Sequence, residues 1–321
     1  MPMDDFTVVV TEPIHPAGVD LLKENGVTVV QLPSGSDEGT LQKEASRADA
    51  LITRGGIKVT RGFMASSPRL KAVGVHGIGC DHVDLTAAGE LGKVVLNTPH
   101  ALTESVAEMA MALMLALTRR VVSADKAVRR GEWNRKYGDL RGVEIAGKTL
   151  GIIGMGRIGS AVARRAKGFD VKVVYHDVYR REDLEEELGI EYASREEVLR
   201  EADLISLHVP YTPETRHMVG AEELASMKDG VYIVNTARGR IIDQQALVEA
   251  LEAGKVAGAA LDVFEEEPLD PGSPLTSIDN VILTPHLAAS SEEAMRRMAV
   301  QAAEGVLKVL NGEAPNHPVA T

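Results

Sequence analysis

The stretch that decides the fold is TLGIIGMGRIGSAVARRAKGFDVKVVYHD, residues 149–177. It begins as a short apolar run, passes through Gly154, Gly156 and Gly159, and continues as a helical pattern into a second apolar run that ends at Asp177. The order strand, G-x-G-x-x-G, helix, strand is the pattern of a βαβ unit that binds a dinucleotide. The glycine pattern is weak on its own, so this prediction depends on the strand before it and the acid after it.

Each of the three glycines has a physical reason to be where it is. Gly154 permits a tight turn after the strand, Gly156 lets the backbone approach a pyrophosphate, and Gly159 lets the helix pack closely on the strand. The N-terminus of that helix then faces the phosphate charge, which its free N–H groups stabilise. The alternative is a tight strand-to-helix turn with an incidental acid.

The acid at the end of the second strand indicates which dinucleotide binds. Asp177 lies 18 residues after Gly159, where its carboxylate would accept hydrogen bonds from the adenosine ribose. A carboxylate there also repels a 2′-phosphate, so the sequence predicts NAD in preference to NADP. Arg180 and Arg181 follow closely, and either would soften that preference.

Short apolar runs alternate with longer amphipathic stretches on both sides of this unit. Runs that are apolar on both faces and alternate with helical patterns predict a parallel sheet with helices on each side. We therefore predict an α/β fold with two such units. The first series of runs covers residues 7–13, 27–32, 50–55, 71–77 and 94–99, and the second covers residues 149–154, 171–177, 204–210, 231–237, 256–264 and 281–286.

Two long helical patterns accompany these runs. Residues 105–130 form the first, and its Met and Leu stripe is typical of a packed core, with a cofactor cleft as the alternative. Residues 291–310 form the second, which is long enough to return to the first sheet. That return would make the first domain discontinuous in sequence.

The composition excludes several classes of protein. The 321 residues are 44% hydrophobic and 26% charged, as in a globular protein with room for two domains. A net charge of −12 argues against binding to nucleic acid, whose phosphates attract basic surfaces. Cys80 is the only cysteine and the nine histidines are scattered, so we expect no intrachain disulfide and no metal site. The chain shows neither a secretory signal nor an apolar run of ~20 residues, so we expect no membrane contact and a cytoplasmic location.

Three polar side chains lie where apolar strands are expected to end. Arg238 follows VYIVNTA, Glu267 lies in LDVFEEEP, and His286 closes VILTPH. Each alone has a structural explanation, respectively a surface ion pair, one of three consecutive glutamates, and a core imidazole. Together they suit the reduction of a 2-oxo acid, because a guanidinium holds a carboxylate and an imidazole supplies a proton near neutral pH. A carboxylate beside the imidazole favours its protonated form, and NAD would supply the hydride.

These motifs give the chain a resemblance to a known family. GIGCDHVDLTAA, NTP, SVAE, GKTLGIIGMGRIG, NTARGRIID, ALDVFEEEPL and LTPH extend over nearly the whole chain, in the order found in D-isomer-specific 2-hydroxyacid dehydrogenases, which include phosphoglycerate dehydrogenase and glyoxylate/hydroxypyruvate reductases. The resemblance implies an NAD-dependent oxidoreductase that interconverts a D-2-hydroxy acid and its 2-oxo acid. Arg238 would hold the substrate carboxylate, and His286 would donate the proton with Glu267 as its partner. The cofactor contacts would be Gly154, Gly156, Arg157, Ile158, Gly159, Asp177, Val209, Pro210, Thr236 and Asp262, together with Val106, His208, Thr215 and Ala237.

The same resemblance implies two Rossmann-like, doubly wound domains with a cleft between them. Residues 1–100 and 290–321 would form a flavodoxin-like substrate domain, and residues 101–289 an NAD-binding domain. A homodimer through the cofactor domains is the usual family assembly, and residues 121–147, with Trp133, would form its arm. At 321 residues, we expect no C-terminal regulatory domain of the kind that some phosphoglycerate dehydrogenases carry.

The substrate itself stays open. Arg54 stands where many phosphoglycerate dehydrogenases carry an arginine, which favours an anionic group at C3 of the substrate. Those enzymes commonly read R-A-G-x-G in the substrate loop, whereas Val75 takes the arginine's place here, and His76 either compensates or is simply a loop residue. Both a glyoxylate/hydroxypyruvate-type acid and 3-phosphoglycerate remain candidates. The expected substrate contacts are Arg54, His76, Gly77, Ile78 and Gly79, with Arg238.

Two other functions are alternatives to 2-hydroxy acid oxidation: dinucleotide sensing and formate oxidation. An NAD(H)-sensing binding protein of the corepressor type shares the fold, but such proteins tend to carry disordered tails, and none is evident here. Formate dehydrogenases share the scaffold and typically carry Gln at the glutamate position, so Glu267 argues against that activity.

Overall fold

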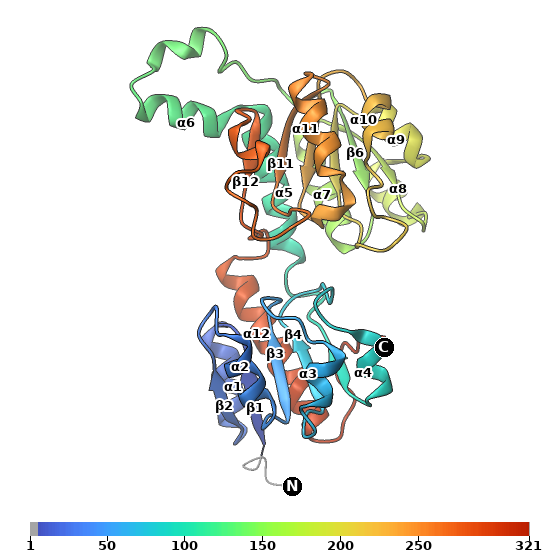
Figure 1. Cartoon of the computed structure of the whole chain (residues 1–321). Helices are drawn as coiled ribbons and strands as arrows, with labels where there is room; N and C mark the ends of the chain where they lie inside the picture. Colours follow the sequence, from blue (N-terminus) through green and yellow to red (C-terminus); the bar gives the residue numbers. More distant parts are fainter. Residues whose placement is uncertain (1–5, 321) are drawn as a thin grey trace. The chain divides into compact units, whose positions relative to one another are not determined.

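The computed structural model describes residues 6–320, apart from the side chain of Glu38. The chain forms two compact units, one of residues 1–102 and 290–321 and the other of residues 103–289. Figure 1 shows that each unit has a parallel sheet with helices on both faces. We call them the discontinuous unit and the central unit.

The discontinuous unit has a five-stranded parallel sheet in the order β2-β1-β3-β4-β5. This is the flavodoxin-like order, in which the strand order across the sheet reverses between β1 and β3. Alternation along β1 shows why both faces are covered, since Val8 and Val10 pack with α1 and α12, while Val9 packs on the opposite face with α2 and α3. The elements are β1 (Thr7–Val10), α1 (Pro16–Glu24), β2 (Thr28–Gln31), α2 (Glu38–Ala45), β3 (Ala50–Thr53), α3 (Arg61–Ala65), β4 (Ala72–Val75), α4 (Leu85–Glu90), β5 (Val94–Leu96) and α12 (Glu292–Leu310).

The last helix completes this unit from the far end of the sequence. Ser291 caps α12 by accepting a hydrogen bond from Ala294 N at 3.1 Å, and Glu292 and Glu293 follow in the first turn, where the helix dipole favours acids. Its buried face, which includes Val306 and Leu310, joins the core formed by β1, β3 and α1. The helix expected at residues 291–310 is therefore confirmed, and it packs on one face of the first sheet.

The central unit has a seven-stranded parallel sheet in the order β12-β11-β10-β9-β6-β7-β8. Counted from β6, this is the dinucleotide-binding order 3-2-1-4-5-6 with one strand added. The elements are α5 (Thr103–Thr118), α6 (Val121–Arg129), the 3₁₀ turn η2 (Trp133–Tyr137), β6 (Thr149–Ile153), α7 (Arg157–Ala166), η3 (Lys167–Phe169), β7 (Lys172–His176), α8 (Glu182–Leu188), β8 (Glu191–Tyr192), α9 (Arg195–Glu201), β9 (Leu204–Leu207), α10 (Ala221–Ser226), β10 (Val231–Asn235), η4 (Gly239–Ile241), α11 (Gln244–Glu252), β11 (Val256–Leu261), η5 (Pro274–Ser277) and β12 (Val281–Leu283).

The helix expected over residues 105–130 is two helices, which corrects the sequence interpretation. α5 ends at Thr118 and α6 begins at Val121, because Arg120 between them has φ 53, a left-handed conformation that ends a helix. The Met-rich part, α5, packs into the core with Met111 and Met114 buried. In contrast, Val121 and Val128 of α6 are more than half exposed. The core interpretation therefore holds for α5 only.

Within the described residues, no helix is both long and apolar enough to cross a membrane.

Candidate active site

In the central unit, the residues that are expected to bind ligands or to react lie at one edge of the sheet. Because every pairing in that sheet is parallel, the strands' carboxyl ends all meet there. The polar residues expected to bind or react follow these ends in turn: Gly154–Gly159 after β6, Asp177 after β7, His208–Pro210 after β9, Thr236–Arg238 after β10, Asp262 and Glu267 after β11, and His286 after β12.

The glycine loop is built as the sequence predicts. Gly154 has φ 96, and a Cβ at this position would lie 2.7 Å from the backbone of His208, so neither the turn nor the contact admits a side chain. A Cβ on Gly159 would lie 2.0 Å from Gly154 O, which shows how closely α7 packs on the loop. A Cβ on Gly156 would meet nothing within 4 Å, so the loop is open at that point.

Asp177 ties the loop to the neighbouring strand end. Its Oδ2 accepts a hydrogen bond from Met155 N at 2.6 Å, and its Oδ1 accepts one from Tyr179 N at 3.1 Å. The carboxylate is thereby held against the glycine loop. This is the location in which an acid meets the adenosine ribose of a bound dinucleotide.

Two observations show that these residues fit a dinucleotide. The open space at Gly156 is where a pyrophosphate approaches the backbone in this fold. In addition, Thr236 Oγ1 is buried and, within residues 6–320, has no hydrogen-bond partner. Buried hydroxyls are rarely left without a partner, so this atom is suited to a ligand.

We predict opposite behaviour for alanine at two of the glycines. Gly159→Ala forces a methyl group onto Gly154 O, so we expect a loss of stability of about 1–3 kcal/mol. Gly156→Ala adds a methyl group to open space, so we expect the melting temperature to change little and NAD affinity to fall by about tenfold or more. Thermal melting and calorimetric titration with NAD separate the two, and unchanged NAD affinity in Gly156→Ala would remove this loop from the cofactor site.

The other expected cofactor residues have varied environments. Arg157 and Ile158 begin α7, exposed and half-buried respectively, whereas Val106 is buried on α5. Thr215 Oγ1 donates to Pro210 O at 2.8 Å and so closes the turn after β9. Val209 and Ala237 pack against the core.

His208 has a structural role that its side chain makes clear. Its Nε2 lies 2.8 Å from Ser206 Oγ, and burial lowers its pKa to about 4. The imidazole is therefore neutral at physiological pH. Its side chain contacts Ser206, and its backbone lies beside the glycine loop at Gly154.

Arg238 is presented by a turn that Asn235 builds. The buried Asn235 accepts a hydrogen bond from Ala237 N at 3.0 Å and donates one to Arg238 O at 2.9 Å. Gly239 follows, where a Cβ would lie 1.9 Å from the backbone of Phe264. The close approach brings the Arg238 turn against the loop that carries Glu267.

Glu267 and His286 form a direct pair. The two oxygens of Glu267 have different partners, since Oε1 accepts from Phe264 N at 3.0 Å and Oε2 lies 2.7 Å from His286 Nδ1. The first contact fixes the carboxylate on its own loop, and the second orients the imidazole. With Nδ1–H donating to the carboxylate, Nε2 is left for proton transfer.

Electrostatics favour a protonated imidazole. The hydrogen bond that His286 donates to Glu267 raises the pKa of His286 above its ordinary value, while burial and the positive charge of Arg238 act in the opposite direction. Burial acts to raise the pKa of Glu267, but the hydrogen bond and charge of His286 outweigh it, so that pKa is lowered. The pair therefore carries an imidazolium beside a carboxylate over a wider pH range than either group would alone.

Asp262 holds the loop that carries His286. Its side chain is fully buried and accepts hydrogen bonds from Thr284 Oγ1 at 2.6 Å, Leu287 N at 2.9 Å and Ala288 N at 2.8 Å. Its backbone oxygen accepts from His286 N at 2.8 Å. These four contacts stabilise His286 at φ 50, a left-handed conformation that costs free energy for a histidine.

The expected substrate residues all belong to the discontinuous unit, except Arg238. Arg54 follows β3 and is exposed, with its guanidinium donating to Pro13 O at 2.9 Å. Gly77 has φ 157, and its oxygen accepts from Thr98 N at 2.9 Å. Within the described chain, no acceptor meets the N–H groups of Ile78 and Gly79. The loop therefore presents two donors suited to an anion.

His76 does not replace the missing arginine charge. It is 5% exposed, and burial together with the charge of Arg54 lowers its pKa to about 4. The imidazole is therefore neutral at pH 7. Its Nε2 is buried and, within residues 6–320, has no hydrogen-bond partner, so it is available as a neutral polar contact.

Sequence reasoning missed two residues that build this site. Asn235 shapes the Arg238 turn, and Thr284 helps Asp262 to hold the His286 loop. Both are polar residues at the end of an apolar strand, in VYIVN and VILT, which is the signal that identified their neighbours.

Comparison with known proteins agrees with this geometry. Residues 111–288 match the model of the D-isomer specific 2-hydroxyacid dehydrogenase, NAD binding domain. The chain belongs to this family. It is an NAD-dependent oxidoreductase that interconverts 2-hydroxy acids and 2-oxo acids.

Three similar proteins show how far the likeness extends. A glyoxylate reductase of Aeropyrum pernix is 46% identical over 96% of this chain and 94% of the relative. A D-3-phosphoglycerate dehydrogenase of Methanocaldococcus jannaschii is 45% identical over 95% of this chain, but the chain spans only 58% of that relative. The crystal structure of the TT0316 protein from Thermus thermophilus has a TM-score of 0.92 and 40% identity, covering 98% of this chain and 100% of that one.

Proposed function

We propose that this dehydrogenase reduces a small 2-oxo acid of the glyoxylate/hydroxypyruvate type with NADH, and catalyses the reverse reaction. The observation that carries the proposal is the His286 Nδ1 to Glu267 Oε2 contact of 2.7 Å, with the charge of Arg238 acting on both groups. Such a set supplies a cation for the carboxylate and an oriented acid for the substrate oxygen.

Each residue of the set has a distinct role. The Arg238 guanidinium holds the substrate carboxylate and polarises the neighbouring carbonyl. His286 Nε2 donates a proton to the carbonyl oxygen as it becomes a hydroxyl, and Glu267 stabilises the imidazolium before that transfer. In the oxidation direction, neutral His286 accepts the proton. The glycine loop, Asp177 and Thr236 would hold NAD, which supplies or accepts the hydride when bound.

The two units divide the binding between them in this proposal. Residues 101–289 bind NAD and carry the reacting side chains, and residues 1–100 with 290–321 bind the rest of the substrate. The free N–H groups of Ile78 and Gly79 support a role for that loop in binding an anion. His76, as a neutral contact, suits a short uncharged substituent better than a phosphate.

A phosphorylated acid of the 3-phosphoglycerate type is the second candidate. Arg54 favours it, because its side chain is exposed and, among the described residues, only Pro13 O and Met295 Sδ accept hydrogen bonds from its guanidinium nitrogens. The remaining donors suit an anion at the far end of the substrate.

A panel of oxo acids decides between the candidates. NADH oxidation followed at 340 nm with glyoxylate, hydroxypyruvate, pyruvate, branched oxo acids and phosphohydroxypyruvate is expected to give the highest kcat/KM for glyoxylate or hydroxypyruvate. Preference for phosphohydroxypyruvate would show that Arg54 is sufficient for a phosphate. Tight NADH binding with no turnover of any oxo acid would contradict the proposal and favour an NAD(H)-sensing role.

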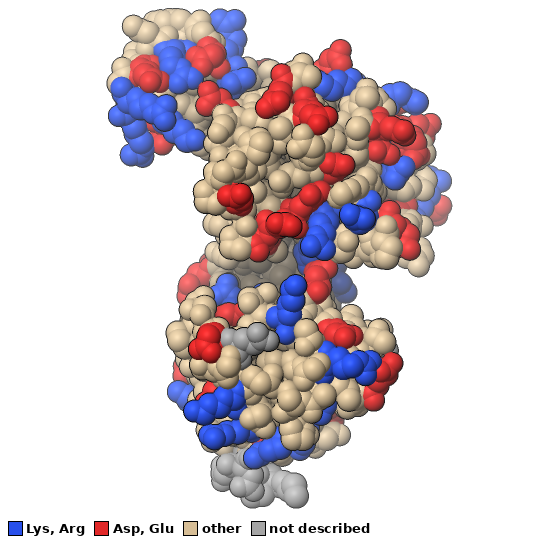
Figure 2. All heavy atoms as spheres, viewed as in Figure 1, with Lys and Arg blue, Asp and Glu red and all other residues tan. Residues whose placement is uncertain are grey.

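We also propose that the protein is a cytoplasmic homodimer whose arm is residues 121–147. Figure 1 shows α6 and the segment after it projecting from the body of the central unit, and Figure 2 shows acidic and basic side chains interspersed on it. Trp133 and Tyr137 are 62% and 74% exposed, and aromatic side chains left so open are typical of an interface. Sedimentation of the intact protein at the mass of one chain would contradict this assembly.

A further inference from the structure

Two arginines follow Asp177 in the sequence, and both bind acids of the short helix α8. Arg181 donates from Nε to Asp183 Oδ1 at 2.9 Å and from Nη2 to Asp183 Oδ2 at 2.7 Å. Arg180 makes the same two-point contact with Glu185, at 2.9 and 2.7 Å. Each guanidinium therefore presents its fork to a carboxylate of the chain itself.

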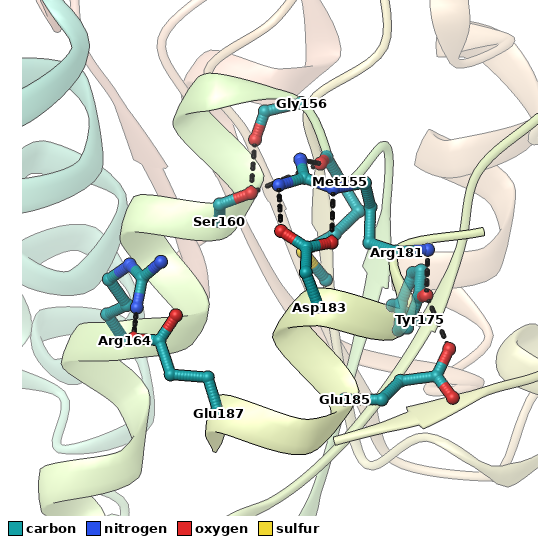
Figure 3. A network of polar contacts seen from close by, with 9 residues as sticks. All are labelled: Met155, Gly156, Ser160, Arg164, Tyr175, Arg181, Asp183, Glu185 and Glu187. Carbon is teal, nitrogen blue, oxygen red and sulfur yellow. Dashed lines mark hydrogen bonds and ion pairs between the residues drawn. The ribbon is translucent and has the colours of Figure 1, made fainter. Parts of the chain in front are cut away.

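Arg181 also contacts the glycine loop directly. Its Nη1 donates to Met155 O at 3.3 Å, and Met155 N donates to Asp177 Oδ2 at 2.6 Å. One loop residue thus binds the acid through its N–H and the cation through its carbonyl. Figure 3 shows Arg181 lying between Met155 and Asp183. Of the two arginines, Arg181 is therefore the one located at the cofactor loop.

A hydroxyl group fixes the base of this arrangement. Tyr175 Oη accepts from Arg181 N at 2.7 Å and donates to Glu185 Oε1 at 2.8 Å (Figure 3). The backbone of Arg181 is anchored by this contact, whereas the pair between its side chain and Asp183 is partly exposed to solvent, with side chains 37% and 63% exposed. Solvated pairs of this kind contribute little to stability. The main effect of the pair is instead that Asp183 engages the Arg181 guanidinium, which lies beside the glycine loop.

NADP differs from NAD by a 2′-phosphate on the adenosine ribose. Asp177 is expected to face this ribose, so the added phosphate would lie near its carboxylate. A phosphate there requires a guanidinium fork to offset the Asp177 charge. Arg181 lies at the loop, but a phosphate would have to displace Asp183 to use its fork, and Asp183 adds a second negative charge to repel it.

We propose that Asp183 is a second determinant of cofactor choice, acting by occupying Arg181. The proposal rests on the cofactor site proposed above, with the adenosine ribose at Asp177. It assigns to Arg181 a latent capacity to bind the 2′-phosphate of a dinucleotide, which appears when its partner acid is removed. Asp177 and Asp183 then exclude NADP by different means, one by repulsion at the ribose and the other by engaging the nearby cation.

Asp183→Asn tests this without relying on turnover. Titration calorimetry of the purified protein with NADP⁺ and with NAD⁺ is expected to show NADP⁺ binding about tenfold more tightly than in the parent, because a charge-assisted contact becomes available. NAD⁺ affinity is expected to stay within about twofold. Asp183→Ser serves as a second variant that keeps a helix-starting residue type near the beginning of α8, so a folding defect of one variant leaves the test intact.

A matched control separates this effect from a general loss of negative charge. Glu187 lies on the same helix and pairs with Arg164 rather than Arg181 (Figure 3), so Glu187→Gln removes the same charge and leaves the Arg181 fork occupied. We expect no selective gain for NADP⁺ in this variant. We also expect Arg181→Met to cancel the gain in the Asp183→Asn background and to change little in the parent.

The outcomes are distinguishable. An NADP⁺ gain that also occurs in Glu187→Gln, or that survives Arg181→Met, would overturn the role of Arg181. No gain in either Asp183 variant, with NAD⁺ still binding, would overturn the role of Asp183. Failure of the parent protein to bind NAD⁺ at all would instead contradict the proposed cofactor site.

Discussion

His286→Asn is expected to lower kcat for oxo acid reduction by about 10³-fold while leaving NADH affinity unchanged. The proton donor is lost, and positioned acid–base groups contribute roughly 10²–10⁴-fold to such reactions. Asparagine is the appropriate replacement because it tolerates the left-handed conformation that His286 adopts at φ 50. The backbone of the loop should therefore keep its shape. The measurements are steady-state rates over the oxo acid panel and NADH binding by fluorescence titration.

The pH dependence of a companion variant identifies the proton donor. In the proposed mechanism, reduction requires protonated His286, so the rate is full below its pKa and falls as pH rises through that pKa, which Glu267 raises. In Glu267→Gln the raising influence is lost, so this descending limb should move to lower pH. Near-normal reduction by His286→Asn, or an unmoved limb in Glu267→Gln, would exclude the pair from proton transfer.

Arg238→Lys is expected to lower kcat/KM for oxo acids by about 10²–10³-fold although the charge is kept. The loss follows from the guanidinium fork, which holds a carboxylate at two points where an ammonium group acts as a point charge. A comparable loss accompanies the removal of one preorganised donor in other active sites. Arg238 also contributes charge to the Glu267–His286 pair, and a lysine keeps part of that influence.

Arg240→Lys is the matched control for that change. Arg240 lies two residues further along the same turn, but its Nε donates to Glu265 O at 3.2 Å and its guanidinium lies over the Tyr211 ring. We expect its kcat/KM to stay within about threefold of the parent. Equal losses in the two variants would mean that the turn is sensitive to any change of arginine, and Arg238 would lose its assigned role.

Much of this fold could be predicted because its strands are apolar on both faces. In a run such as VVV of β1 every residue is buried, Val8 and Val10 on one face and Val9 on the other, so the sheet and its two layers of helices follow from the pattern. The glycine loop could be predicted equally well, because at Gly154 and Gly159 any side chain would collide with nearby backbone atoms. Parallel strands then place the residues that follow them at one edge.

Other features depend on contacts that a linear pattern does not contain. The break between α5 and α6 rests on the left-handed conformation of Arg120, a residue type that gives no local warning of it. β8 is two residues long and exposed, so it has no apolar signal. The acids around Arg180 and Arg181 read as a solvated helix face, and only the three-dimensional structure shows which carboxylate each guanidinium meets. The charge state of His76 likewise depends on burial, which its sequence neighbours do not reveal.

The buried carboxylate of Asp262 has a consequence for how such an enzyme changes over evolution. Asp262 accepts four hydrogen bonds that fix the His286 loop, so contacts within the chain itself set the shape of that loop. In the proposed function, substrate choice rests instead on Arg54 and the loop of residues 75–79, which belong to the other unit. On that proposal, substitutions at Arg54 or in the loop of residues 75–79 can change which oxo acid is accepted, while Asp262 still holds the His286 loop in place.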